Sequence, residues 1–313
     1  MTRSIAVVVV TYNAVEHVGA MVASVRADGS GRSLPIVVVD NGSTDGTVAL
    51  LRGLADVQVI EQTNRGYASG VNRGIAATPA GHDILVLNPD LRLRTGAIRQ
   101  LAEALDAAPD IAIAVPALRD DHGHLQASLR REPTWWRTLV ETLVGGTRAG
   151  RLGESFRPHN KGLQEADWAT GAALLIRRDV MEDLGPWDES YFLYSEETEF
   201  CLRARDAGYR LVCQPRAIAE HVGGDMARNP LLWALRAVNR VRLERRRRGR
   251  VAASISRSMA ILFELRRVLT GDAVSRTALW ALTTRDLEAT AIRLTTVLGG
   301  DPAGLVSPLV PRR

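Results

Sequence analysis

The sequence predicts an α/β protein with a mostly parallel sheet, flanked by helices, and a helical C-terminal extension. In the first part of the 313-residue chain, short apolar runs alternate with segments whose apolar residues recur at helical spacing. That β-α-β-α order is typical of a parallel sheet with helices on both faces. Beyond about Asp225 only helical spacing remains. We therefore expect one domain at 1–225 and a helical extension at 226–313.

The expected elements follow in order along the chain. Apolar segments predict strands at 5–10, 36–39, 57–60, 84–87, 111–115 and 172–176. The run at 5–10 has no polar alternation and is typical of a strand buried on both faces. Apolar residues at helical spacing predict helices at 15–25, 48–54, 70–77, 98–105 and 196–207, and in the extension from 231, from 261 and at 279–298. The Gly- and Arg-rich stretch at 145–162 has no period, so we expect a mobile loop there.

The composition excludes several classes of protein. No apolar run approaches the roughly 20 residues of a membrane-spanning helix. Cys201 and Cys213 form no C-x-x-C pair, so zinc and redox motifs are absent, and we expect two buried thiols in a reducing cytoplasm. The residues after the first predicted strand, at 11–14, include no glycine, which argues against a dinucleotide oxidoreductase. The Gly-Lys-Ser/Thr motif of P-loop enzymes is also missing. A sugar-phosphate nucleotidyltransferase would also carry a Gly-rich loop there.

Polar clusters follow three of the predicted strands. They are Thr11-Tyr12-Asn13, Asp40-Asn41-Gly42 and Asn88-Pro89-Asp90. Because parallel strands place their carboxyl ends at one edge of the sheet, and ligands bind there, we expect one shared site. A carboxylate such as Asp90 can bind Mg²⁺ or Mn²⁺ together with a diphosphate. The alternatives are a Pro-Asp turn at 89–90 and a capped helix start after Asp40, with Asp45 favoured by the helix dipole.

Taken together, these segments resemble the family-2 glycosyltransferases. The resemblance covers about residues 4–224 and rests on eight pieces in order, at 7–13, 39–46, 64–68 with 72–74, 87–90, 170–172 with 177–178, 184–189, 194–199 and 220–221. It implies a Rossmann-like GT-A fold and the transfer of a sugar from a nucleotide-diphosphate donor. The positions that it assigns to the donor are Thr11, Tyr12, Asn13, Asp40, Asn41, Asn72, Arg73, Asn88, Asp90 and Gly171.

The resemblance also assigns the metal and the catalytic base. Asn88-Pro89-Asp90 occupies the D-x-D position, with Asp90 as the main ligand of Mg²⁺ or Mn²⁺ and Asn88 in place of the first Asp. His221 matches a position near the metal and the diphosphate. Glu197 occupies the position of the base that takes a proton from the acceptor, so one direct displacement inverts the anomeric carbon. The alternatives are a structural His221 and a solvated acidic helix face at 196–199.

The substrates are less defined than the family. The Asn-Pro-Asp form resembles rhamnosyltransferases that use dTDP-sugars, so dTDP-rhamnose is favoured and a UDP-sugar comes next. The acceptor stays open among a polysaccharide, a lipid-linked sugar and a small molecule. A catalytically degenerate module that only binds nucleotide sugar or a partner is the alternative function.

The net charge of +5 is concentrated in arginines at 236–250. A helix over 231–250 is therefore predicted to lie on anionic lipid at the inner membrane face of the cytoplasm. A solvated helix face is the alternative. No aromatic interleaving or nucleic-acid motif accompanies these arginines, so we expect no nucleic-acid partner. The apolar helices of the extension offer a face for a homodimer.

Overall fold

The computed structural model describes residues 3–29, 34–144, 150, 152–159, 161–221 and 229–300. The chain divides into two compact units. Unit 1 comprises Met1–Glu132, Ser155–Ser190 and Glu196–Gly223, and unit 2 comprises Pro133–Glu154, Tyr191–Ser195 and Gly224–Arg313. The domain boundary predicted near residue 225 lies outside the described residues, as does part of the loop predicted at 145–162.

Unit 1 is built on a large mixed sheet with the strand order β3-β2-β1-β4-β11-β6-β12-β5, and β9 also pairs with β12. The order of its elements along the chain is β1 (Ile5–Thr11), α1 (Val15–Asp28), β2 (Ile36–Asp40), α2 (Thr47–Arg52), β3 (Val57–Glu61), α3 (Tyr67–Ala77), β4 (Asp83–Leu87), β5 (Leu91–Leu93), α4 (Ala97–Asp106), β6 (Ile111–Arg119), β9 (Gln164–Ala166), β11 (Ala173–Ile176), α6 (Arg178–Leu184), α7 (Glu196–Asp206) and β12 (Arg210–His221). A small second sheet joins β10 (Trp168–Ala169), β7 (Leu129–Arg130) and β8 (Ser155–Phe156).

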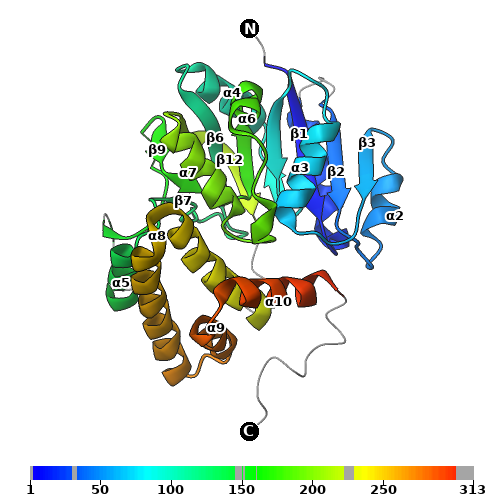
Figure 1. Ribbon diagram of the computed structural model, residues 1–313. Helices are drawn as coiled ribbons and strands as arrows, with labels where there is room; N and C mark the ends of the chain where they lie inside the picture. The colour runs from blue at the N-terminus through cyan, green and yellow to red at the C-terminus, as the bar shows by residue number, and fades with distance from the viewer. Residues whose placement is uncertain are drawn as a thin grey trace. The chain divides into compact units, whose positions relative to one another are not determined.

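The centre of the large sheet is parallel. β1 pairs in parallel with β2 and with β4, and Thr11 lies opposite Asp40 in that register. β11 runs antiparallel to β4 and β6, whereas β12 runs parallel to β6. The mostly parallel α/β fold that the sequence predicts is confirmed, and the carboxyl ends of β1, β2 and β4 meet at one edge (Figure 1).

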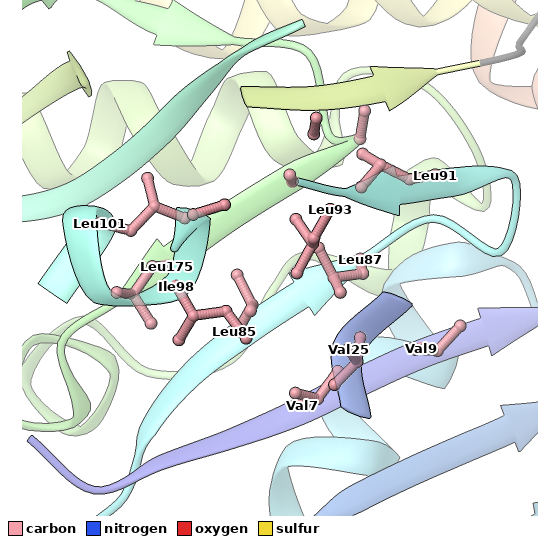
Figure 2. Close-up of a cluster of buried hydrophobic side chains, with 14 of the residues drawn as sticks. Val7, Val9, Val25, Leu85, Leu87, Leu91, Leu93, Ile98, Leu101 and Leu175 are labelled. Atoms are coloured by element: carbon pink, nitrogen blue, oxygen red, sulfur yellow. The ribbon is translucent and has the colours of Figure 1, made fainter. Parts of the chain in front are cut away.

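Helices cover both faces of the sheet because each central strand is buried on both sides. Val7 and Val9 of β1 belong to one apolar cluster and Val8 and Val10 to another, as the two-residue period of a strand requires. The first cluster includes apolar residues of α1, α2 and α4, and the second includes residues of α3, α6 and α7. Figure 2 shows the first cluster, where Leu85 and Leu87 of β4 meet side chains of α4 and β5.

Two glycines bring α3 unusually close to β1. A Cβ added at Gly70 would lie 2.7 Å from a methyl group of Val10, and one at Gly74 would come still closer to Val8. Such distances leave no room for a side chain, so the helix packs directly on the strand. This close packing fixes Tyr67, the first residue of α3, near the carboxyl ends of β1 and β4.

Unit 2 is helical. Its elements are α5 (Trp135–Val144), α8 (Pro230–Leu269), α9 (Val274–Thr283) and α10 (Leu287–Gly299). α8 covers the two helices predicted from 231 and from 261, with a kink at Gly249, whose φ of 81° is non-helical. The single helix predicted at 279–298 is wrong. The chain breaks between α9 and α10 because Asp286 caps α10, its Oδ1 accepting from the backbone N–H groups of Glu288 and Ala289 at 2.9 and 3.1 Å.

An apolar cluster of α8, α9 and α10 holds unit 2 together. Its fully buried members include Leu235 and Val238 of α8, Ala278 and Ala281 of α9 and Leu294 of α10. Over the described part of the chain, no helix is long and apolar enough to cross a membrane.

Candidate functional site

The carboxyl ends of β1 and β2 form a tightly hydrogen-bonded loop pair, residues 11–13 and 40–47, which we name the β1/β2 edge. The Asp40 carboxylate is completely buried. One oxygen accepts from the Thr11 and Ser43 hydroxyls at 2.8 and 2.6 Å, and the other accepts from the N–H groups of Gly42 and Ser43 at 3.0 and 2.8 Å. Four donors fill the accepting positions of the carboxylate.

Two asparagines extend this network to neighbouring loops. Asn41 donates to the Gly66 carbonyl at 3.1 Å and accepts from Gln62 at 2.7 Å. Asn13 has a left-handed φ of 51°, and its side chain accepts from the Thr44 N–H at 2.8 Å. The neighbouring Tyr12 is 42% exposed. The edge therefore combines a fixed buried floor with an exposed ring on which a planar group can stack.

Asp45 closes the edge at the start of α2. Its carboxylate accepts from the N–H groups of Val15 and Thr47 at 3.0 and 3.1 Å and from the Thr47 hydroxyl. Burial raises the pKa of this carboxyl, but the hydrogen bonds from Thr47 and Val15 outweigh that and hold the pKa below its usual value. These contacts agree with the alternative interpretation of this segment, a capped helix start in which Asp45 lies at the N-terminus of the helix.

A second group gathers around the Tyr67 hydroxyl, and we name it the Tyr67 cluster: Tyr67, Asn88, Asp90, Gly171 and Glu197. The hydroxyl lies 3.2 Å from Asn88 Oδ1 and 3.3 Å from the Gly171 carbonyl, and can donate to either. Burial raises the pKa of Tyr67, and so do the negative charges of Glu196, Glu197 and Asp90. The phenol therefore stays protonated as a donor between the Asp90 side and the Glu197 side of the cluster.

Glu197 lies in the first turn of α7, directly beside Gly171. A Cβ added at Gly171 would be 3.5 Å from both Cβ and Cγ of Glu197, so the absence of a side chain at Gly171 lets Glu197 pack closely against this backbone. Arg203 of the same helix donates to the carbonyls of Leu184 and Pro186, and these bonds anchor α7 to the end of α6 and the residues that follow it. Phe200 stacks on Trp187 with ring centroids 5.3 Å apart.

The backbone that leads into α7 is strained. Phe192, Tyr194 and Ser195 have φ values of 64°, 67° and 82°. Left-handed conformations are costly for residues other than glycine and concentrate at functional sites, where the surrounding structure holds them. Here the buried Asn239 of α8 donates to the carbonyls of Tyr191, Leu193 and Tyr194 at 2.8, 3.0 and 3.2 Å. These bonds fix the segment from which α7 begins.

Asp90 and His221 form the candidate metal pair. The antiparallel pairing of β5 with β12 sets His221 opposite Leu91, and His221 Nε2 lies 3.4 Å from Asp90 Oδ2. Gln126 lies on the other side of the ring, 3.4 Å from Nδ1, and donates to the His221 carbonyl at 3.1 Å. Burial raises the pKa of Asp90, but the hydrogen bond and charge of His221 outweigh it, so the pKa lies below its usual value.

A carboxylate and an imidazole are suitable ligands for Mn²⁺ and, through the carboxylate, for Mg²⁺. Among the described residues, no group of three His, Cys, Asp or Glu side chains could hold a metal ion. An ion held by this pair would complete its coordination with water and with ligand oxygens.

Two of the residues predicted to bind the donor are occupied by other contacts. Asn72 exchanges two hydrogen bonds with the Trp187 backbone, both 2.9 Å, and donates to Glu189 at 3.0 Å. Arg73 lies on the same helix and donates to Gln62 at 3.3 Å. Asn72 thus holds the segment at Trp187 and Glu189, which precedes α7. The donor-binding role of both residues stays a prediction.

The sequence alone did not assign a role to Tyr67 or Gln126. Tyr67 lies within one of the matched motif pieces, at 64–68, and that position was the signal that could have found it. Gln126 belongs to no motif, and only the fold brings it to His221.

Comparison with known proteins identifies the family. The family model of Glycosyl transferase family 2 matches residues 6–185. The chain is 31% identical over 253 residues to an N-acetylglucosaminyl-diphospho-decaprenol L-rhamnosyltransferase of Mycobacterium tuberculosis, which covers 74% of this chain and 80% of that protein.

Solved structures agree on the fold. The mannosyltransferase PcManGT from Pyrobaculum calidifontis, in complex with GDP-Man and Mn²⁺, has a TM-score of 0.54 at 15% identity, over 96% of this chain and 86% of that one. GalNAc-T7 with UDP, GalNAc and Mn²⁺ has a TM-score of 0.55 at 16% identity, over 71% of this chain and less than half, 44%, of that one. The fold is thus that of GT-A enzymes, and the chain belongs to the family-2 glycosyltransferases.

Proposed function

We propose that this glycosyltransferase moves rhamnose from a dTDP donor to a hydroxyl of an N-acetylglucosaminyl diphospholipid, with inversion and with a divalent metal. The name of the Mycobacterium tuberculosis relative supports both the sugar and the acceptor class. The observation that carries the proposal is the arrangement of the Tyr67 cluster, in which one hydroxyl contacts Asn88 on the metal side and Gly171 beside Glu197.

The β1/β2 edge would hold the nucleotide. Because Asp40 already accepts from four donors, a pyrimidine N–H would bind it only by displacing one of them, and the half-buried Ser43 hydroxyl is the donor that we expect to be displaced. Tyr12 would contribute its exposed ring to the base or ribose. Thr11 then acts by holding Asp40 rather than by touching the donor.

Asp90 and His221 would hold Mg²⁺ or Mn²⁺ together with the donor diphosphate, and the ion would offset the charge that develops on the leaving group. Asn88 lies next to this pair and keeps an oxygen directed at Tyr67. Tyr67, protonated at any working pH, would donate to an oxygen of the donor or acceptor when substrate displaces one of its two long contacts.

Glu197 would take the proton from the acceptor hydroxyl as that oxygen attacks the anomeric carbon. A positioned general base contributes about 10²–10⁴-fold to the rate. The acceptor hydroxyl would approach Glu197 beside Gly171, whose backbone lies next to the Glu197 side chain.

The experiment is a transfer assay with dTDP-rhamnose, Mn²⁺ and a short-chain N-acetylglucosaminyl diphospholipid. We expect transfer by the wild type, inverted product by NMR, and a loss of about 10²–10⁴-fold in kcat for Glu197→Gln. The control is Glu199→Gln on the same helix, whose carboxylate pairs with Arg203 at 3.0 Å, and it should retain most activity. Equal activity of Glu197→Gln and wild type would refute Glu197 as the base. Nucleotide binding without transfer to any acceptor would favour the degenerate binding module.

A further inference from the structure

The C-terminal half of α8, residues 250–269, exposes an apolar stripe that is interrupted by Ser258. Its members are Val251, Ile255, Leu262, Leu265 and Leu269, which are 39–78% exposed. At 3.6 residues per turn these five positions fall within an arc of about 80° and extend along about 27 Å of helix. Large aliphatic side chains aligned in this way on an exposed helix indicate a surface that contacts something apolar.

The rest of this half is cationic. Its basic residues are Arg250, Arg257, Arg266 and Arg267, and its one acidic residue is Glu264. Glu264 is buried and accepts from the Trp233 indole at 3.0 Å. An apolar face flanked by arginines, with no exposed carboxylate, is the pattern of helices that lie in a membrane interface.

A cationic cavity of about 410 Å³ opens beside the stripe, at the Gly249 kink. Five arginines line it, Arg242, Arg245, Arg250, Arg257 and Arg285, against the two carboxylates of Asp286 and Glu288. Both carboxylates are already engaged. Asp286 caps α10, and Glu288 forms an ion pair with Arg242 at 2.6 Å.

Three guanidinium groups are left to attract an anion. Over the described chain, Arg245, Arg250 and Arg285 make no ion pair or side-chain hydrogen bond, and Arg257 is used to hold the carbonyls of Leu282 and Thr284. Guanidinium groups bind phosphate oxygens through paired N–H donors. A phosphate group is thus the chemistry that the cavity favours, and the apolar stripe next to it favours a phosphate attached to lipid.

The N-terminal half of α8 differs, although it holds most of the arginines of the predicted lipid-contact helix. Arg240 pairs with the buried Glu154, and Arg248 pairs with Glu244 at 2.9 Å. The charges of Arg240 and Arg248 are thus paired with carboxylates of unit 2. The apolar stripe at 250–269 extends the surface available to lipid further along the chain than the sequence predicts.

We propose that the C-terminal half of α8 docks on an anionic phospholipid surface, with the apolar stripe in the headgroup boundary and a lipid phosphate in the cavity. A second copy on the same stripe is disfavoured because it would bring two surfaces with an excess of arginines together. The proposal concerns membrane binding alone and does not depend on the donor or the acceptor.

The test is co-sedimentation of the full chain with vesicles of phosphatidylcholine, alone or mixed with phosphatidylglycerol. We expect binding to the anionic vesicles only, weakened by salt. Leu262→Ser/Leu265→Ser should lower the partition coefficient by about tenfold or more. Arg250→Gln/Arg285→Gln should lower it by about fivefold per arginine. The charge-matched control, Arg52→Gln/Arg99→Gln on α2 and α4, should bind like wild type.

A fluorescent label gives an independent readout. Burial raises the thiol pKa of both Cys201 and Cys213 to about 12, so neither should react at pH 8. Ile255→Cys can then be labelled alone with an environment-sensitive dye. Its emission should shift to the blue on anionic vesicles, and that of Arg99→Cys should not.

Either of two results would overturn the proposal. One is equal binding of wild type and the Leu262→Ser/Leu265→Ser variant, or no binding of either. The other is a wild-type dimer that this variant converts to a monomer, because the stripe would then be a subunit interface.

Discussion

The β1/β2 edge and the Tyr67 cluster lie at the same end of the central sheet, yet they are held in different ways. At the edge, four donors contact Asp40 at 2.6–3.0 Å. In the cluster, Tyr67 contacts its partners at 3.2–3.3 Å and His221 lies 3.4 Å from Asp90. A floor for the nucleotide has to exist before the ligand arrives, whereas catalytic hydrogen bonds often tighten only when substrate binds. We therefore expect substitutions at the edge to lower stability and substitutions in the cluster to lower activity.

After Glu197→Gln, the largest expected effect is that of His221→Ala, which removes the partner of Asp90 in the cluster. Loss of one of the two protein ligands should raise the Mn²⁺ concentration for half-maximal activity by about 10–100-fold, because only Asp90 would remain. The temperature of unfolding without metal should change little. The measurement is a Mn²⁺ titration of transfer activity, with His124→Ala, an exposed histidine that pairs with Asp120, as the control. An unchanged titration would assign His221 to structure alone.

Thr11→Val should have the next effect, on stability. The change keeps the shape of the side chain but removes one donor from the buried Asp40 carboxylate, which should lower the free energy of unfolding by about 1–2 kcal/mol. Urea denaturation measures this. Thr95→Val, at an exposed threonine, should stay within about 0.5 kcal/mol of wild type. If Thr11→Val is as stable as wild type, the edge is not the rigid floor described above.

Tyr67→Phe should have the smallest effect, and on activity. Its hydroxyl makes only long contacts in the free enzyme, so we expect stability within about 0.5 kcal/mol of wild type and a fall in kcat of about three- to tenfold. Steady-state kinetics and urea denaturation of the same preparation separate the two. If Tyr67→Phe lost as much stability as Thr11→Val and kept its kcat, the proposed division between a stabilising edge and a catalytic cluster would be wrong.

The central strands and their polar ends could be predicted because both signals are local. Apolar runs without polar alternation mark β1, β2 and β4, and the parallel connection places Thr11, Asp40 and Asn88 at one edge. β12 was not predicted, because Gln214, Pro215 and Arg216 interrupt its apolar pattern where the register shifts. The break between α9 and α10 was hidden by apolar spacing that continues across the Asp286 cap.

The candidate site was predictable at the positions where the residue type itself indicates a chemical role. Carboxylates and an imidazole at strand ends, as in Asp90 and His221, can be read from the sequence. The links between them cannot, because they depend on which side chains the fold brings together. Tyr67 reaches Asn88 and Gly171 from the start of α3, and Gln126 meets His221 from a loop 95 residues away.

The most direct test of the metal-dependent donor site is thermal unfolding with dTDP, UDP and GDP, each with and without Mn²⁺, on wild type and Asp90→Ala. We predict that dTDP stabilises the wild type only with Mn²⁺, by about 2.7 kcal/mol at a hundredfold excess over its Kd. Asp90→Ala should lose this effect while unfolding normally without ligand. No stabilisation of the wild type by any nucleotide in any metal condition, or the same Mn²⁺-dependent stabilisation in Asp90→Ala, would contradict the account.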